Sequence, residues 1–222
     1  MKIIKPYFVI EDEIDGNKIL KKIEKAGRTC YKSEDKITDE SAKSFVAGIL
    51  KSGHHSVIEH EKITVRVICD RGVSHEIVRH RIGSYSQEST RYCNYSKDKF
   101  GNEITVIEPC FWKQGSSKPA PAEAAADKYE EWKKACENAE KAYFKLLELG
   151  AKPEEARSVL PNSLKTEIVI TYNLREWRHF FILRTSKRAH PQMREIATSI
   201  LKEFKRLIPV IFDDIQPEEN GD

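Results

Sequence analysis

The sequence predicts an α+β fold in which a mixed or antiparallel sheet is flanked by long helices. Strand-like segments are separated by groups of helices, which is typical of this class. The 222 residues suit one large domain or two small ones, and 39% hydrophobic residues support a core. We expect a single domain over residues 1–215. No Gly-x-Gly-x-x-Gly or Walker loop occurs among the ten glycines, so a Rossmann crevice is not expected.

The first half of the chain predicts two strands and three helices. In order, these are a strand over residues 3–10, helices over about 15–27 and 38–53, a strand over 61–70 and a short helix over 74–78. The first strand is predicted at a sheet edge because Pro6 has no N–H to donate. The second alternates apolar with polar residues, as half-buried strands do. Ser74 is expected to cap the short helix, which leads to Arg79.

The second half is richer in helix. The sequence predicts a strand over 104–107, a loop over 115–121, a long amphipathic helix over about 122–149, a strand over 166–172 and helices over 174–183 and 191–207. Gly150 ends the long helix, and Pro153 suits the first position of a further helix that carries Arg157. The acidic tail, residues 216–222, is predicted to be disordered.

Composition excludes several classes of protein. The net charge of +3 is too small for nucleic-acid binding by bulk electrostatics, so local clusters at 79–91 and 184–194 must recognise any anion. No apolar run reaches the length of a membrane span, and residues 1–5 lack a signal-peptide core. The five cysteines contain no Cys-x-x-Cys pair, which argues against a disulfide framework and a zinc site. We expect a soluble, cytoplasmic protein without a metal, a membrane partner or a nucleic-acid partner.

The most informative stretch runs from Arg79 to Tyr92. It combines three arginines, one histidine and three serines, and it is too polar for a core. Arginine presents a rigid fork of donors that suits phosphates and planar carbonyl edges. The stretch therefore predicts a cradle for a nucleotide or another anion, with a solvated basic loop as the plain alternative.

Arg79-His80-Arg81, followed after seven residues by Ser89, resembles the signature of the flavin-dependent thymidylate synthases. Further segments that resemble this family occur in the family's order between about residues 50 and 200. They are Gly53–His60, Ala156–Pro161, Asn173–Arg175, Leu183-Arg184 and His190–Gln192.

The resemblance implies a reaction and an assembly. Enzymes of this family methylate dUMP to dTMP with FAD, with 5,10-methylenetetrahydrofolate as carbon donor and with NADPH or NADH as reductant. It also implies flavin binding outside a Rossmann fold and a homotetramer whose active sites are shared between subunits.

Arg184 is the expected catalytic residue. Making C5 of uracil nucleophilic requires either a thiolate at C6 or fixed cationic donors at the N3–O4 edge. Pro109-Cys110 resembles the nucleophile of the flavin-independent enzymes, but its apolar, strand-like surroundings argue against that role. Arg184 matches the family's uracil-binding arginine. The alternative is a helix C-terminal arginine that interacts with the macrodipole.

The resemblance also assigns ligand contacts. For dUMP these are Glu76, Ile77, Val78, Arg79, Gln87, Glu88, Ser89, Thr90, Arg91, Arg157 and Arg184. For FAD they are Ser56, Arg79, His80, Arg81, Gln87, Asn173, Leu174, Arg175 and His179. Ser89 and the backbone amides of residues 87–90 are expected to bind phosphate, although Ser89 as a nucleophile with His80 as its base stays open.

Some positions depart from the family pattern or are only weakly placed by it. Gln87 stands where many relatives have glutamate, and His179 where many have asparagine; both still form hydrogen bonds. His54 and His190 are not firmly placed by the comparison. Two rival functions stay open: a nucleic-acid-binding module built on the basic, tyrosine-containing stretch, and a silent flavoprotein that binds nucleotides without methyl transfer.

Overall fold

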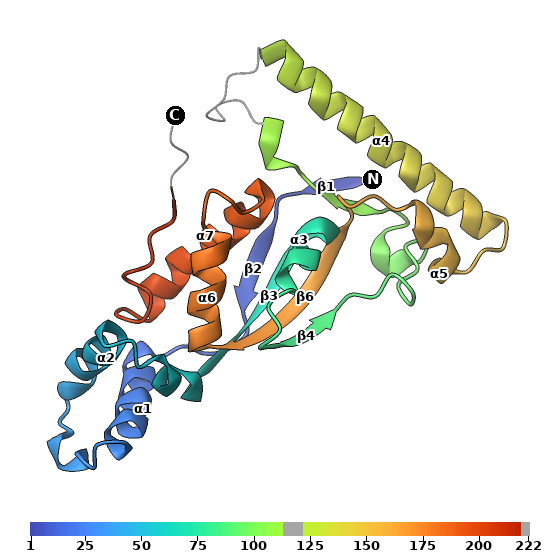
Figure 1. Cartoon of the computed structure of the whole chain (residues 1–222). Coiled ribbons are helices and arrows are strands. Elements are labelled where there is room, and N and C mark those ends of the chain that lie inside the picture. The colour runs from blue at the N-terminus through green and yellow to red at the C-terminus, as the bar shows by residue number, and fades with distance from the viewer. Residues whose placement is uncertain (113–121, 219–222) are drawn as a thin grey trace.

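A four-stranded antiparallel sheet forms the centre of the fold (Figure 1). The computed structural model describes residues 1–112 and 122–218. The strand order is β2 (Tyr7–Ile10), β3 (Lys62–Asp70), β6 (Lys165–Asn173) and β4 (Ser84–Gln87). The two long strands, β3 and β6, lie in the middle and pair along their whole length. Their alternating pattern places one face of the sheet in the core.

A second, two-stranded sheet pairs β1 (Lys2–Ile4) in parallel with β5 (Thr105–Ile107). The single strand predicted over residues 3–10 is therefore wrong, because the chain leaves one sheet and enters the other at Lys5-Pro6. Proline cannot donate to a ladder, so the switch falls where a continuous strand would lose a hydrogen bond.

Helices cover the sheet and extend beyond both of its ends (Figure 1). They are α1 (Gly16–Thr29), α2 (Ser41–Lys51), α3 (Arg71–Ile77), α4 (Ala122–Glu148), α5 (Pro153–Ala156), α6 (Leu174–Arg184) and α7 (Pro191–Leu207). Short 3-10 turns lie at Glu34–Lys36, His55–His60, Asp98–Phe100, Cys110–Trp112 and Arg157–Val159. The predicted α+β class with a mixed and antiparallel arrangement of strands is confirmed.

The main core lies between the sheet and the helices α1, α2, α6 and α7. Trp177 of α6 is fully buried, stacks on Phe181 and donates from Nε1 to the carbonyl of Ile63 at 3.0 Å. Burial of such large aromatic side chains stabilises the pairing of α6 with β3. A smaller cluster under α4 contains Tyr143 and Tyr95. The main core thus fixes α6, the helix that ends in Arg184.

Three local predictions differ from the structure or fall partly outside the described residues. Helix α3 is capped by Asp70, whose Oδ1 accepts from the Val73 amide at 2.8 Å, so the predicted cap at Ser74 is wrong. The loop predicted over 115–121 lies outside the described residues. In the predicted tail, Glu218 accepts a hydrogen bond from the Lys187 amide at 2.8 Å, and residues 219–222 lie outside the described part. No helix within that part is long and apolar enough to cross a membrane.

Candidate active site

Helix α6 presents three site residues on one face. Asn173 caps it, because its Oδ1 accepts from the Glu176 amide at 2.8 Å. Glu176, Phe180 and Arg184 follow at intervals of four residues and therefore share a face over about two helical turns. Glu176 and Phe180 are buried and Arg184 is half-buried. This spacing is visible in the sequence, but the sequence did not identify Glu176 as a site residue.

His80 lies against this face and bridges its two charged residues. The turn after α3 places it there, with the His80 amide donating to the Ile77 carbonyl at 3.1 Å. Nδ1 of the ring lies 3.0 Å from Oε1 of Glu176, and Nε2 accepts from Nε of Arg184 at 3.0 Å. The ring also packs edge-on against Phe180 at 5.1 Å. Both nitrogens are engaged, so in this structure His80 has none to offer a flavin.

Burial shifts the pKa values of both His80 and Glu176. Burial, with the nearby positive charges of Arg184 and His179, lowers the pKa of His80 to about 4. Burial also raises the pKa of the Glu176 carboxyl. The imidazole is therefore neutral at physiological pH.

Arg184 is held by α3 as well as by His80. Its Nη1 donates to Oε2 of Glu76 at 2.8 Å, and its Nη2 donates to the Glu76 carbonyl at 3.1 Å. These bonds go to another helix and not to the last carbonyls of α6, which argues against a purely helix-terminal role. Within residues 1–112 and 122–218, one N–H on each of Nη1 and Nη2 is left for a ligand.

Three side chains in and beside this network have the spacing of metal ligands. His80, Glu176 and His179 place one potential ligand atom each within 4.8 Å of one another. However, both His80 nitrogens are already bonded, and one of them faces the guanidinium of Arg184. A cation would lie next to that positive charge. The arrangement favours a hydrogen-bond network over a metal centre.

A second group collects the residues expected to bind phosphate. Nη1 of Arg157 donates to Oγ1 of Thr90 at 3.2 Å, and the Arg91 amide donates to Oγ of Ser89 at 3.3 Å. Arg91 and Arg157 are exposed, and Arg91 lies 3.6 Å from Glu154. Among the described residues, no hydrogen bond or ion pair joins this group to the Arg184 network.

Several residues assigned to ligands face the protein instead. The side chains of Ile77 and Leu174 are fully buried in the core, so only their backbone is available. The Glu88 carboxylate pairs with Lys165 at 2.7 Å, and its amide donates to the Glu167 carbonyl. The Gln87 amide nitrogen bonds Ser74 and Thr166 at 2.9 and 3.1 Å. The backbone amide of Glu88 is therefore not available to the predicted phosphate site. Val78 is exposed.

Of the residues assigned to flavin, Asn173 lines a depression, which also borders the turn that carries Ser56 and the loop that follows Arg81. It has a volume of about 470 Å³ and is lined from the 3-10 turn at 55–60, the start of β3, the Ile82–Ser84 loop and Asn173. Ser56, Arg79 and Arg81 are exposed, and within the described ranges neither arginine has an ion pair. Arg175 pairs with Glu59 at 2.6 Å. His179 is exposed beside His80, with ring centroids 5.5 Å apart.

Three residues singled out from the sequence lie elsewhere. Cys110 begins the 3-10 turn Cys110–Trp112 and not a strand, and it is not part of the Arg184 network. His54 is exposed and its Nδ1 lies 3.1 Å from the Tyr31 hydroxyl. His190 precedes α7 and packs edge-on against Phe111 at 5.4 Å.

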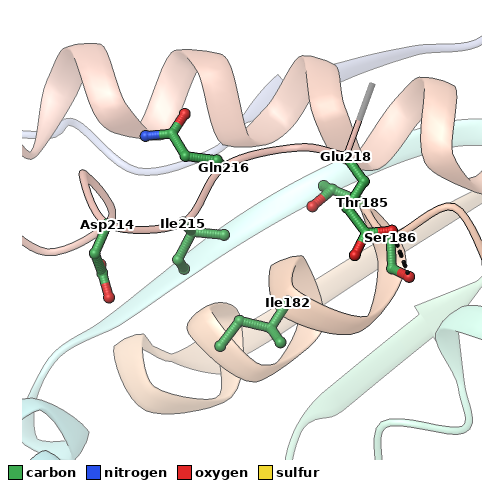
Figure 2. Close-up of a pocket in the computed structure, with 7 residues that line it drawn as sticks. All are labelled: Ile182, Thr185, Ser186, Asp214, Ile215, Gln216 and Glu218. Atoms are coloured by element: carbon green, nitrogen blue, oxygen red, sulfur yellow. Dashed lines mark hydrogen bonds between the residues drawn. The ribbon is translucent and has the colours of Figure 1, made fainter. Parts of the chain in front are cut away.

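A further cavity lies between α6 and the C-terminal segment (Figure 2). It measures about 240 Å³, and its lining includes Asp214 and Glu218 but no cationic side chain. Glu218 reaches Ser186 and the Lys187 amide, which anchors the loop after Arg184. The negative charge of the cavity lining does not suit an anionic nucleotide, so the cavity is not a candidate substrate site.

The chain matches one protein-family model and shares its fold with a solved structure. A family model described as thymidylate synthase complementing protein matches residues 14–210. A flavin-dependent thymidylate synthase of Pyrococcus abyssi is 37% identical over 183 residues, covering 81% of this chain and 70% of the relative. Another, of Geobacter sulfurreducens, is 34% identical over 199 residues, covering 86% and 80%. The UMP/dUMP methylase PolB of Streptomyces cacaoi, solved with 5-Br dUMP, shares the fold with a TM-score of 0.77 at 21% identity and covers 96% of both chains.

Proposed function

Because this chain belongs to the flavin-dependent thymidylate synthase family, we propose that it reductively methylates dUMP to dTMP. The carbon donor in this proposal is 5,10-methylenetetrahydrofolate, the flavin is FAD, and the reductant is NADPH or NADH. The observation that carries the proposal is the guanidinium of Arg184. It is fixed from two sides by His80 and Glu76 and retains N–H groups for a ligand.

The residues around the 470 Å³ depression fit a flavin nucleotide. Arg79 and Arg81 are exposed cations, and Arg81 directly precedes Ile82 in the lining of the depression, which suits a diphosphate. Arg175 and His179 offer further donors from α6, Ser56 offers its hydroxyl, and Asn173 offers its side-chain NH₂ because its Oδ1 caps α6. When bound, reduced flavin supplies the hydride that completes the new methyl group.

Arg184 would activate the pyrimidine. Its free N–H groups donate to the N3–O4 edge of uracil and stabilise negative charge there, which raises the electron density at C5 for its attack on the methylene carbon. The half-buried position strengthens this interaction, since the effective dielectric constant falls away from bulk water. No thiol belongs to the network described around Arg184, so this route takes the place of addition at C6.

The phosphate of dUMP would bind at Ser89, Arg91 and Arg157. Two exposed guanidinium groups, a hydroxyl and the amides at the start of the following turn form a cluster of donors. Charge-assisted hydrogen bonds of this kind supply much of the affinity for a phosphate.

A homotetramer with shared sites would bring the separate groups together. The phosphate group and the Arg184 network have no bond between them within the described chain. Apolar side chains near both groups are exposed, with Ile82 at 68% and Tyr92 at 78%, and burial in a symmetric interface would remove them from water. FAD that binds across subunits should stabilise the assembly by mass action. Light scattering with and without FAD tests this, and a monomer that binds FAD and turns over dUMP would refute it.

The activity itself is tested by the absorbance spectrum of the purified protein and by tritium release from [5-³H]dUMP with methylenetetrahydrofolate and NADPH. Arg184→Ala should lower turnover by about 100- to 1,000-fold, the cost of one lost transition-state donor, while the flavin spectrum is retained. Near-normal turnover would refute the role of Arg184. Salt-dependent oligonucleotide binding without flavin colour would favour a nucleic-acid-binding module instead, and bound flavin with dUMP affinity but no tritium release would favour a silent flavoprotein.

A further inference from the structure

Glu176 is a buried carboxylate that forms no ion pair with a lysine or an arginine in the described part of the chain. It is 7% exposed, and among the described residues its carboxylate forms a hydrogen bond only with His80, 96 positions earlier in the chain. A buried carboxylate is costly unless it is hydrogen-bonded. Its single partner is itself buried, at 4% exposure, and lies directly between Glu176 and Arg184.

The bonds around His80 determine where its proton lies. An arginine side chain has only donors and stays protonated, so Nε of Arg184 must donate and Nε2 of His80 must accept. A neutral imidazole then carries its proton on Nδ1 and donates it to Oε1 of Glu176 at 3.0 Å. The three residues form a directed chain from Arg184 to His80 to Glu176.

We propose that Glu176 is a positioning residue for uracil activation, acting through His80 on Arg184. By holding the imidazole proton on Nδ1, it keeps Nε2 free to accept from Nε of Arg184, which aims the Nη edge of the guanidinium at the ligand. The role in activation rests on the proposed function, whereas the tautomer follows from the hydrogen bonds alone.

Loss of the acceptor would disturb Arg184 in a defined way. Without Glu176 the imidazole is free to carry its proton on Nε2, where the N–H would face the N–H of Arg184 Nε. The guanidinium would then turn away and keep only its bonds to Glu76. Small misplacements of a catalytic group cost about 100-fold in rate.

Two variants distinguish whether Glu176 acts as a hydrogen-bond acceptor or through its negative charge. Glu176→Leu removes the acceptor with little change in volume, and it should lower kcat about 10- to 100-fold, with the Kd for dUMP changed less than about threefold because the phosphate binds elsewhere. Glu176→Gln should retain kcat within about threefold. The side-chain oxygen of glutamine can still accept the Nδ1 proton of His80, so this variant keeps the acceptor and removes the charge.

Glu24→Leu is the matched control. Glu24 is also fully buried, and it bonds Arg28 at 2.8 Å and Ser41 at 2.9 Å, apart from the Arg184 network. It should lower the melting temperature without lowering kcat, which distinguishes loss of a buried carboxylate from loss of positioning.

A second readout is independent of activity. Solid-state NMR of the ¹⁵N-histidine-labelled protein should show the His80 ring neutral and protonated on Nδ1, with the signal assigned by its loss in His80→Gln. A ring that carries its proton on Nε2, or on both nitrogens, at neutral pH would overturn the proposal even if Glu176→Leu fails to fold. Turnover of Glu176→Leu within threefold of wild type would overturn it too, as would equal losses in both Glu176 variants. If the wild-type protein releases no tritium, the proposed function fails, and the NMR result still decides the tautomer.

Discussion

Gly83→Ala tests how closely the signature loop approaches the core. A Cβ at this position would lie 2.3 Å from both Cδ1 and Cε1 of Tyr172 and 3.2 Å from the Thr171 carbonyl oxygen. Carbon atoms pack at about 3.5–4.0 Å, so the ring would have to move by more than about 1 Å. Tyr172 is only 1% exposed, and its hydroxyl lies 2.8 Å from that of Tyr85. The ring also packs on Trp177 at 4.7 Å.

The cost of this substitution can be bounded from those contacts. Overpacking a core costs about 1–3 kcal/mol, and losing one tyrosine hydrogen bond adds about 1 kcal/mol. We therefore expect the free energy of unfolding to fall by about 2–4 kcal/mol. For a chain of this length, that corresponds to a melting temperature lower by roughly 4–16 °C.

Thermal unfolding followed by circular dichroism at one protein concentration is the assay. Gly48→Ala is the control, because a Cβ on Gly48, inside α2, meets nothing within 4 Å. That variant should gain about 0.5–1 kcal/mol from helix propensity. A Gly83→Ala protein that melts within about 1 °C of wild type would refute the steric argument, as would a comparable loss in the control.

Three further substitutions probe the site and its support. Ser89→Ala should weaken dUMP binding about tenfold or more by calorimetry while measurable turnover remains; lost turnover with unchanged binding would indicate a nucleophilic serine. Cys110→Ala should keep turnover within about twofold, and an inactive, folded variant would revive the thiolate route. Asp214→Asn breaks the ion pair of Asp214 with the buried Arg178, which are 2.6 Å apart. It should lower the free energy of unfolding by only about 1 kcal/mol at neutral pH, because the Asp214 side chain is largely exposed to water. Its hydrogen bonds with Arg178 hold the pKa of Asp214 below the ordinary 3.8. The stabilisation is therefore complete above pH 3.8 and disappears as the pH falls through the lower folded pKa. A difference in melting temperature between the wild type and Asp214→Asn that persists in strong acid would contradict this.

Local periodicity predicted the parts of the fold that depend on it. The helices α1, α2, α6 and α7 and the strands β3 and β6 follow apolar patterns that the sequence displays directly. Strand β4 was missed because its residues, Ser84–Gln87, are mostly polar and lie at a sheet edge, where no alternating pattern is needed. The cap of α3 was misplaced because two capping residue types, Asp70 and Ser74, stand close together.

The sequence allowed site residues to be predicted where a residue's own chemistry points to a role, but not where the role depends on a partner that is remote in the chain. Arginine chemistry and the resemblance of Leu183-Arg184 to a family segment made Arg184 the candidate, and the structure surrounds it with hydrogen-bond partners. Glu176 was missed because its partner His80 is remote in sequence, and the spacing of four and eight residues to Phe180 and Arg184 is equally typical of a core face. The buried position of Ile77 depends on the same tertiary packing. Such long-range pairing is not encoded in any local pattern.

The tyrosine pair behind Gly83 connects the sheet to the network of His80, Glu176 and Arg184. Tyr85 of β4 donates to the His80 carbonyl, and the Tyr172 hydroxyl of β6 donates to the Ile77 carbonyl at 3.3 Å. Both bonds hold the turn that places the His80 ring between Glu176 and Arg184. A shift of Tyr172 in Gly83→Ala should therefore reduce kcat at temperatures where the protein is still fully folded, whereas Gly48→Ala should not. If folded Gly83→Ala retains the wild-type kcat, the tyrosine pair supports the fold but does not position His80.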